Sequence, residues 1–139
     1  HLLQYPEHRG IQSLVRDLNC LYRARKELHE LDCEGDGFAW IDCNDNEASV
    51  ISYIRRGRDP NRFLVVVCNF TPVVRSGYRI GVPRSGAYRE VLNTDSAHYA
   101  GSNVGNAGAI MADGPSMHGH EQSLVMTLPP LATLILEPA

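Results

Sequence analysis

The 139-residue sequence has no apolar run close to the ~20 residues that a membrane-spanning helix needs. We therefore expect no membrane segment and no membrane partner. The start of the chain also lacks the basic residues, apolar stretch and small-residue cleavage site of a secretory signal. Without such a signal, the cytoplasm is the expected compartment.

Positive charge is scarce as well. The chain has 13 Lys and Arg residues against 16 Asp and Glu residues, which gives a formal net charge of -3. The basic residues are spread between the first helical segment and scattered loops, and they form no stripe that could follow a phosphate backbone. Nucleic acid is therefore not an expected partner.

The four cysteines form no Cys-x-x-Cys pair and have no histidine at zinc-finger spacing. They are Cys20, Cys33, Cys43 and Cys68. A chain of this length can bury a single sizeable core, so it does not need disulfides for stability. We expect reduced, partly buried thiols, although spacing alone leaves disulfides open.

One amphipathic helix is predicted from Pro6 to about Lys26, because apolar residues recur there at steps of three and four. The apolar residues of this stripe are Ile11, Leu14, Val15, Leu18, Leu21 and Tyr22. Pro6 suits a first helical turn, and residues 28–31 are expected to add a short turn. A stripe of this width must pack on a partner surface, so we expect it to cover a sheet or to form an oligomer contact.

After Gly37 the sequence changes to short apolar runs separated by Gly, Pro, Asn and Asp, which is typical of an antiparallel all-β domain. Seven strands are expected, at residues 38–42, 49–55, 63–69, 77–82, 88–92, 123–128 and 132–136. The third is apolar on both faces and is expected to be central. Residues 94–122 predict a long loop with a short strand near 109–112.

Trp40 is the only tryptophan and alternates with Phe38 on one face of the first expected strand, while Ala39 and Ile41 lie on the other. If Ile41 points inward, Trp40 is an exposed ring on which the flat apolar face of a sugar can stack. If Trp40 points inward, it is a core residue. Asp42 and Asn44 follow Trp40, and they are the side chains expected to bind sugar hydroxyls. Tyr78, Tyr88 and Tyr99 are weaker candidates of the same kind.

Other patterns fit catalytic or metal sites poorly. No pair of carboxylates stands out for glycosyl transfer, because the acidic residues lie in turns that favour Asp for local hydrogen bonds. Residues 42–47 begin like a calcium loop but have Glu47 where glycine is required, so a hairpin turn is expected there. His118, His120 and Glu121 could offer metal ligands, yet no helix holds them at a suitable step, and no metal or cofactor is expected.

The glycine-rich residues 101–108 lack the Lys-Ser/Thr ending of a phosphate-binding loop. We expect these glycines to serve backbone turns with positive φ.

Five segments have orders of residues that no simple structural rule requires, and these segments carry a resemblance to a known family. They are RGIQSLVRDLN at 9–19, LHELD at 28–32, CNFTPV at 68–73, EVLNTDSAHYAGSNVGN at 90–106 and LPPLAT at 128–133. Together and in this order, they closely resemble the carboxyl-terminal part of bacterial 1,4-α-glucan (glycogen) branching enzymes of the α-amylase superfamily, glycoside hydrolase family 13.

The resemblance implies a β-sandwich that follows a (β/α)8 catalytic barrel. Residues 1–32 would be the last barrel helix and its exit, and residues 33–139 the β-domain. An intact enzyme of this kind cuts α-1,4-glucan and transfers the cut chain to a 6-hydroxyl with retention, through a covalent glycosyl-enzyme intermediate and without a cofactor. The family's catalytic carboxylates lie in barrel motifs that this sequence does not contain, so the chain alone is expected to be inactive.

The partners implied are α-glucan, such as glycogen or amylose, and the barrel of the same chain, against which Trp40 would pack if it neither binds glucan nor lies in the core. Two rival functions stay open. A free-standing carbohydrate-binding module would share the sandwich and the exposed aromatic residue, but would not need the long helix. A small hydrolase or metalloenzyme would use His118, His120 and Glu121.

Overall fold

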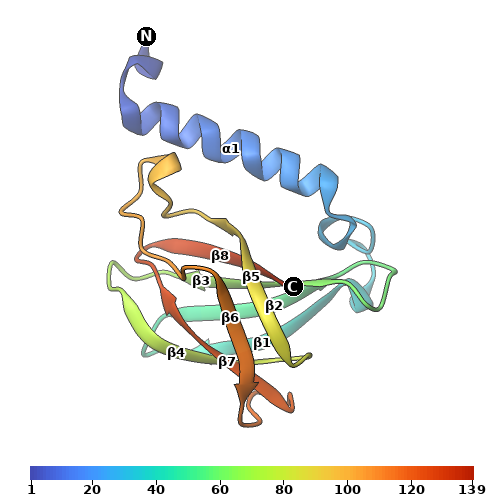
Figure 1. Cartoon of the computed structure of the whole chain (residues 1–139). Coiled ribbons are helices and arrows are strands. Elements are labelled where there is room, and N and C mark those ends of the chain that lie inside the picture. Colours follow the sequence, from blue (N-terminus) through green and yellow to red (C-terminus); the bar gives the residue numbers. More distant parts are fainter.

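The computed structural model describes residues 1–139 and consists of one long helix above a curled antiparallel sheet (Figure 1). Helix α1 is Pro6–Ala24, and short 3-10 turns follow at Lys26–Leu28 (η2) and Ala97–Tyr99 (η4). The strands are β1 (Phe38–Asp45), β2 (Val50–Arg56), β3 (Phe63–Asn69), β4 (Arg75–Val82), β5 (Gly86–Asn93), β6 (Ala109–Gly114), β7 (Gln122–Leu128) and β8 (Ala132–Pro138).

All eight strands belong to one sheet, in the order β1-β2-β3-β8-β5-β6-β7-β4, and every pair is antiparallel. The sheet curls until the two edge strands β1 and β4 lie beside each other, so its halves face one another as two layers (Figure 1). The predicted mainly-β class is confirmed, with the two layers formed by a single sheet. The short strand expected near residues 109–112 is β6.

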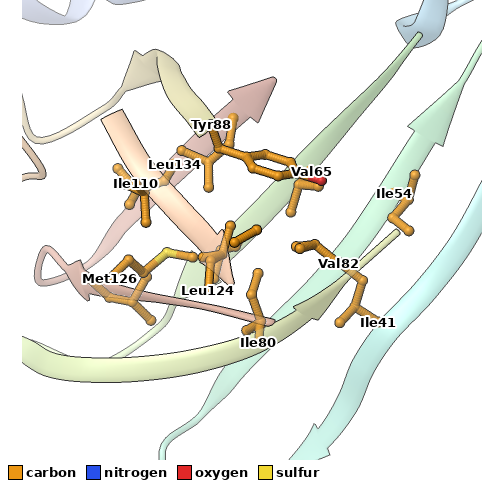
Figure 2. Packing of buried hydrophobic residues seen from close by; sticks show 14 of the residues in the cluster. Ile41, Ile54, Val65, Ile80, Val82, Tyr88, Ile110, Leu124, Met126 and Leu134 are labelled. Atoms are coloured by element: carbon orange, nitrogen blue, oxygen red, sulfur yellow. The ribbon is translucent and has the colours of Figure 1, made fainter. Parts of the chain in front are cut away.

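The concave side of the sheet encloses the main core, to which every strand contributes (Figure 2). Its 17 buried residues are aliphatic except for Phe63, Met126 and Tyr88. Leu124, Met126 and Leu128 on β7 all point into it, as their two-residue spacing predicts. This side of the sheet is closed by its own side chains.

A second, smaller core lies on the convex side, where α1 covers the middle of the sheet. Leu64 and Val66 of β3 are buried there, while Phe63 and Val65 of the same strand belong to the main core. Strand β3 is therefore buried on both faces, which confirms the central position predicted from its continuous apolar run.

The apolar stripe of α1 is divided between two environments. Leu14 and Leu21 pack against the second core, whereas Ile11, Val15, Leu18 and Tyr22 are exposed. One edge of the stripe therefore packs on the sheet and is partly buried, and the rest of the stripe faces away from the sheet. Ile11, for example, is 59% exposed. Although α1 is long, no helix of the structure is both long enough and apolar enough to cross a membrane.

Helix α1 also docks on η4. Gly10 lies so close to the Tyr99 carbonyl group that a Cβ at this position would clash with it. The Tyr99 hydroxyl donates a hydrogen bond to the Asp17 carboxylate at 3.0 Å. One of the segments that carry the family resemblance, residues 90–106, therefore contacts the helix and fixes its place above the sheet.

Candidate functional site

Trp40 is the centre of an aromatic cluster on the convex side of β1 and β2. Its ring is 52% exposed, while Ile41 is buried in the main core. Phe38 meets the indole edge-on at 4.8 Å between ring centroids, and Tyr53, the cross-strand partner of Trp40, meets it edge-on at 5.9 Å. Edge-to-face contacts at these distances hold the indole in place and leave one part of it open to solvent.

A β-bulge separates Trp40 from Asp42. Trp40 pairs with Tyr53 and Asp42 with the next residue, Ser52, so Ile41 is an extra residue in β1. Ser52 is buried on the concave side, and Asp42 opposite it points to the same side. Trp40 and Asp42 therefore lie on opposite faces of the strand, although simple alternation places residues 40 and 42 together.

Asp42 and Asn44 belong to the end of β1, at the turn into β2. One oxygen of Asp42 accepts a hydrogen bond from the Asn44 amide at 2.9 Å, and the other lies 3.5 Å from Nε2 of His118. The Asn44 side chain is exposed and has no hydrogen bond within the chain. The structure brings Asp42 together with His118 rather than with Trp40.

A polar cleft of about 540 Å³ surrounds this turn on the side away from Trp40. Its side chains include Asp42, Asp45, Arg75, Tyr78 and His118. The Tyr78 hydroxyl donates to Asp45 at 2.7 Å, and the other oxygen of Asp45 accepts from the Ala48 amide at 2.9 Å. The expected hairpin turn is thus present, and its carboxylates are held by the backbone of the turn.

Hydrogen bonding and burial shift two pKa values in this cleft. The hydrogen bond from Tyr78, helped by the Ala48 amide, lowers the pKa of Asp45 below its usual value. Burial and the neighbouring Asp45 carboxylate raise the pKa of Tyr78. At neutral pH the pair is therefore a carboxylate and a neutral phenol, an arrangement that stabilises the turn and has no adjacent nucleophile.

The His118 to Glu121 segment is a tight turn closed by backbone hydrogen bonds between Met117 and His120. His118 accepts a hydrogen bond from the Gly81 amide at Nδ1, so its Nε2 carries the proton and faces Asp42. Burial, together with the nearby Arg56 and His118, lowers the pKa of His120. No three His, Cys, Asp or Glu side chains come close enough together to hold a metal ion.

Asp95 organises the loop that follows β5. Although only 9% exposed, it accepts hydrogen bonds from the Ser102 amide, the Ser102 hydroxyl and the Val104 amide, each between 2.8 and 3.0 Å. Three donors on one carboxylate hold the loop closed. These hydrogen bonds explain why an aspartate stands at position 95, and they require no catalytic role for it.

The same loop is tied back to the sheet by Glu90 and Asn106. Glu90 accepts two hydrogen bonds at 2.9 Å from Asn106, whose side chain also pairs with the backbone of Thr127. Of the glycines in residues 101–108, only Gly108 has positive φ. Gly101 is instead required by its close approach to the Asp95 backbone, and Gly105 lies against the end of the Asn93 side chain, so our explanation by positive φ was wrong for these two.

The remaining candidates lie apart from the aromatic cluster. Tyr88 is fully buried, and Tyr99 is engaged with Asp17. Of the four thiols, only Cys68 is partly buried and the others are exposed, contrary to our expectation. Sequence reasoning did not single out Tyr53, which supports Trp40. The sequence did contain a signal for Tyr53, because alternation places it on the face of β2 that does not carry Val50 and Ile54.

The fold, one curled antiparallel sheet with a loop that holds α1, defines the chain as an all-β domain. The sequence model for the alpha amylase, C-terminal all-beta domain matches residues 40–139, so the chain belongs to this family.

Several curated relatives of the chain have the name 1,4-alpha-glucan branching enzyme GlgB. The chain is 53% identical to the protein of Rhodospirillum rubrum over 138 residues, which are 99% of this chain and 18% of the relative. Identity to the protein of Nitrosomonas europaea is 55% over 139 residues (100% of this chain, 19% of the relative). For Aquifex aeolicus it is 52% over 137 residues (99% and 22%). The chain thus spans about a fifth of these relatives and matches their carboxyl-terminal region.

Among solved structures, an alpha-amylase from H.orenii superposes with a TM-score of 0.41 and 20% identity, over 73% of this chain and 16% of that one. A superposition of this quality adds nothing to the family assignment.

Proposed function

We propose that this chain is the carboxyl-terminal part of a 1,4-α-glucan branching enzyme. Such an enzyme cuts α-1,4-linked glucan and transfers the cut chain to a 6-hydroxyl, as a cytoplasmic step of glycogen biosynthesis. The observation that carries the proposal is an identity of 52 to 55% to proteins of this name along the whole length of the chain.

The catalytic step is assigned to the part of the enzyme outside these residues. Retention of configuration requires two carboxylates about 5 Å apart on either side of the scissile bond. The carboxylates that are best held here, Asp45 and Asp95, accept hydrogen bonds from the backbone of their own loops. The chain alone is therefore expected to be inactive.

In this proposal residues 1–32 are the last helix of the catalytic barrel with its exit segment, and residues 33–139 are the β-domain. The exposed half of the α1 stripe supports this division. Ile11, Val15 and Tyr22 are each about half exposed on a helix whose other edge is already buried. Apolar side chains in a continuous row of this kind indicate an interaction surface, and the barrel of the same chain is its proposed partner.

An exchange experiment tests the proposal. The corresponding region of the Rhodospirillum rubrum enzyme is replaced by this chain, and branching of amylose is followed by the fall in iodine absorbance. We expect the hybrid to branch amylose and the isolated 139-residue chain to show no turnover. Turnover by the isolated chain, or a folded hybrid without activity, would overturn the assignment.

A second function, contact with α-glucan, is favoured by the aromatic cluster. We infer that the open part of the Trp40 ring stacks on the apolar face of a glucose unit, while Phe38 and Tyr53 hold it in place. Asp42 and Asn44 stay predicted hydroxyl-binding residues. A glucan chain would have to pass around the edge strand β1 to reach Asp42 from Trp40.

Because Trp40 is the only tryptophan, its fluorescence reports directly on this contact. We expect titration with maltoheptaose to change the emission of Trp40, and glycogen in a native gel to retard the chain. Trp40→Ala should abolish the retardation, while Phe70→Ala, which removes a 60% exposed ring elsewhere, should leave it unchanged. Equal retardation of the Trp40→Ala variant and the unmodified chain would exclude this contact.

A further inference from the structure

Two of the segments that carry the family resemblance, residues 68–73 and 128–133, meet at one end of the sheet. Asn69 joins them: its side-chain nitrogen donates to the carbonyl groups of Val73 at 2.8 Å and Pro129 at 2.9 Å. Its oxygen accepts from the amide and the hydroxyl of Thr71. Asn69 is 2% exposed, so a buried and fully bonded side chain fixes the two loops to each other.

The two loops present apolar side chains to solvent. Phe70 is 60% exposed, Val73 51% and Leu131 68%. Between Phe70 and Leu131 lies a hollow of about 130 Å³, bordered also by Cys68 and Thr133. We call Phe70, Val73, Leu131 and this hollow the Phe70–Leu131 platform.

Leu131 reaches this exposed position at a conformational cost. Its φ is +48°, in the left-handed region that bulky side chains rarely adopt, and its amide is held by the Thr71 carbonyl at 2.8 Å. The fold therefore maintains an unfavourable backbone conformation to present an apolar side chain to water. Strain of this kind is typical of functional surfaces.

We propose that the Phe70–Leu131 platform is a docking surface for the remaining part of the enzyme chain, which inserts one apolar side chain into the hollow. The inference rests on the proposed function, because the relatives are about five times longer than the region matched here. The hollow has the size of one aliphatic or aromatic side chain. The loops that form the platform, residues 69–74 and 129–131, carry no charged residue, as an apolar contact requires.

Other occupants fit less well. A stable dimer needs roughly 20 residues on each side, and the platform presents only three exposed apolar side chains. A glucan would find the Phe70 ring but no free side-chain donor in the two loops, because the amide hydrogens of Asn69 and the hydroxyl hydrogen of Thr71 are already bonded. An intramolecular contact needs less area, because the chain connection removes most of the entropic cost of association.

The substitution Leu131→Asn tests the proposal, because asparagine tolerates positive φ and removes the apolar side chain. In the isolated chain we expect the midpoint of thermal unfolding to rise by about 3 °C as strain is relieved. In the hybrid with the Rhodospirillum rubrum enzyme we expect the unfolding midpoint of this domain to fall by a similar amount, because the docking contact is lost. Met111→Ala, which truncates a 52% exposed side chain on β6, should change neither protein.

Thiol labelling gives a second measurement, which does not depend on a variant. Cys68 borders the hollow, so its alkylation, located by peptide mapping, should be about tenfold slower in the hybrid than in the isolated chain.

Labelling at equal rates, or a rise of the unfolding midpoint by Leu131→Asn in both proteins, would overturn the docking proposal. An inactive unmodified hybrid would instead overturn the proposed function, so the two failures are distinguishable. Dimers of the isolated chain that Leu131→Asn dissociates would assign the platform to a second copy and also overturn the proposal.

Discussion

The two sides of the curled sheet differ in how completely they are covered. On the concave side, 17 buried residues from all eight strands fill the space between the layers. On the convex side, four buried residues lie under one edge of α1, while Ile11, Val15, Trp40 and Phe70 are exposed. The concave side makes the chain a folded unit, and the convex side has the exposed apolar side chains that we propose as contacts with the rest of the enzyme and with glucan.

The largest expected difference is between two leucines on opposite sides. Leu134 is fully buried in the main core, and Leu134→Ala should lower the free energy of unfolding by about 3 kcal/mol. Leu18 is 37% exposed on α1, and Leu18→Ala should cost less than about 1 kcal/mol in the isolated chain. Urea denaturation followed by circular dichroism measures both. Equal losses would mean that the convex side is as fully packed as the core.

The free energy of unfolding should be next most sensitive to substitutions in the loop that follows β5, which joins the convex side to α1. Asp95→Ala removes the acceptor for two backbone amides and one hydroxyl, and we expect a loss of about 2 kcal/mol in urea denaturation. Ser102→Ala removes only the hydroxyl donor and should cost about 1 kcal/mol or less. If the two variants lose the same stability, Asp95 does not organise the loop as we describe.

Alkaline pH tests the concave side through Tyr88, whose pKa is raised to about 12 mainly by burial. An unfolded tyrosine loses its proton near pH 10, so stability is complete below pH 10 and falls as the pH rises toward 12. Between pH 8 and pH 11 the unmodified chain should lose about 1 kcal/mol more than Tyr88→Phe. Parallel losses in urea titrations would show that Tyr88 ionises as freely in the fold as in the unfolded chain.

The smallest effect is expected where α1 meets η4. The hydrogen bond from Tyr99 is the main cause of the lowered pKa of Asp17. Tyr99→Phe should therefore raise the pKa of Asp17 toward its ordinary value, as followed by NMR titration of the carboxyl group. An unchanged pKa would mean that the hydroxyl does not contact Asp17 in solution and that the Gly10 approach alone positions the helix.

The elements of the concave side were predictable from sequence because two-residue alternation directly reports one buried face. The run 63–68 likewise indicated a strand that is covered on both sides. The division of the α1 stripe could not be predicted, since the pattern shows which residues avoid water and not how wide the covering surface is. Leu14 and Leu18 look equivalent in the sequence, but Leu14 packs against the second core and Leu18 is 37% exposed.

The candidate site was less predictable. The sequence left open whether Trp40 is exposed, and only the fold decides this by placing Ile41 in the core. Pairing of Asp45 with Tyr78 joins residues 33 positions apart, which no local pattern reports. The family resemblance named the 90–106 segment, but the reasons for its residues appear only in the contacts that close the loop, tie it to the sheet and hold α1.

The extra residue in β1 has a consequence for engineering and for comparing sequences. The register shifts by one residue here and again between Asp42 and Asp45, so only the residues between the two shifts depart from the even and odd rule that the rest of β1 follows. Deleting Ile41 would remove the first bulge and leave Asp42 opposite Ser52, so Trp40 and Asp42 would stay on opposite faces of the strand. The deletion would instead take a buried side chain out of the main core, whereas a substitution of Trp40 or Asp42 would alter one surface only.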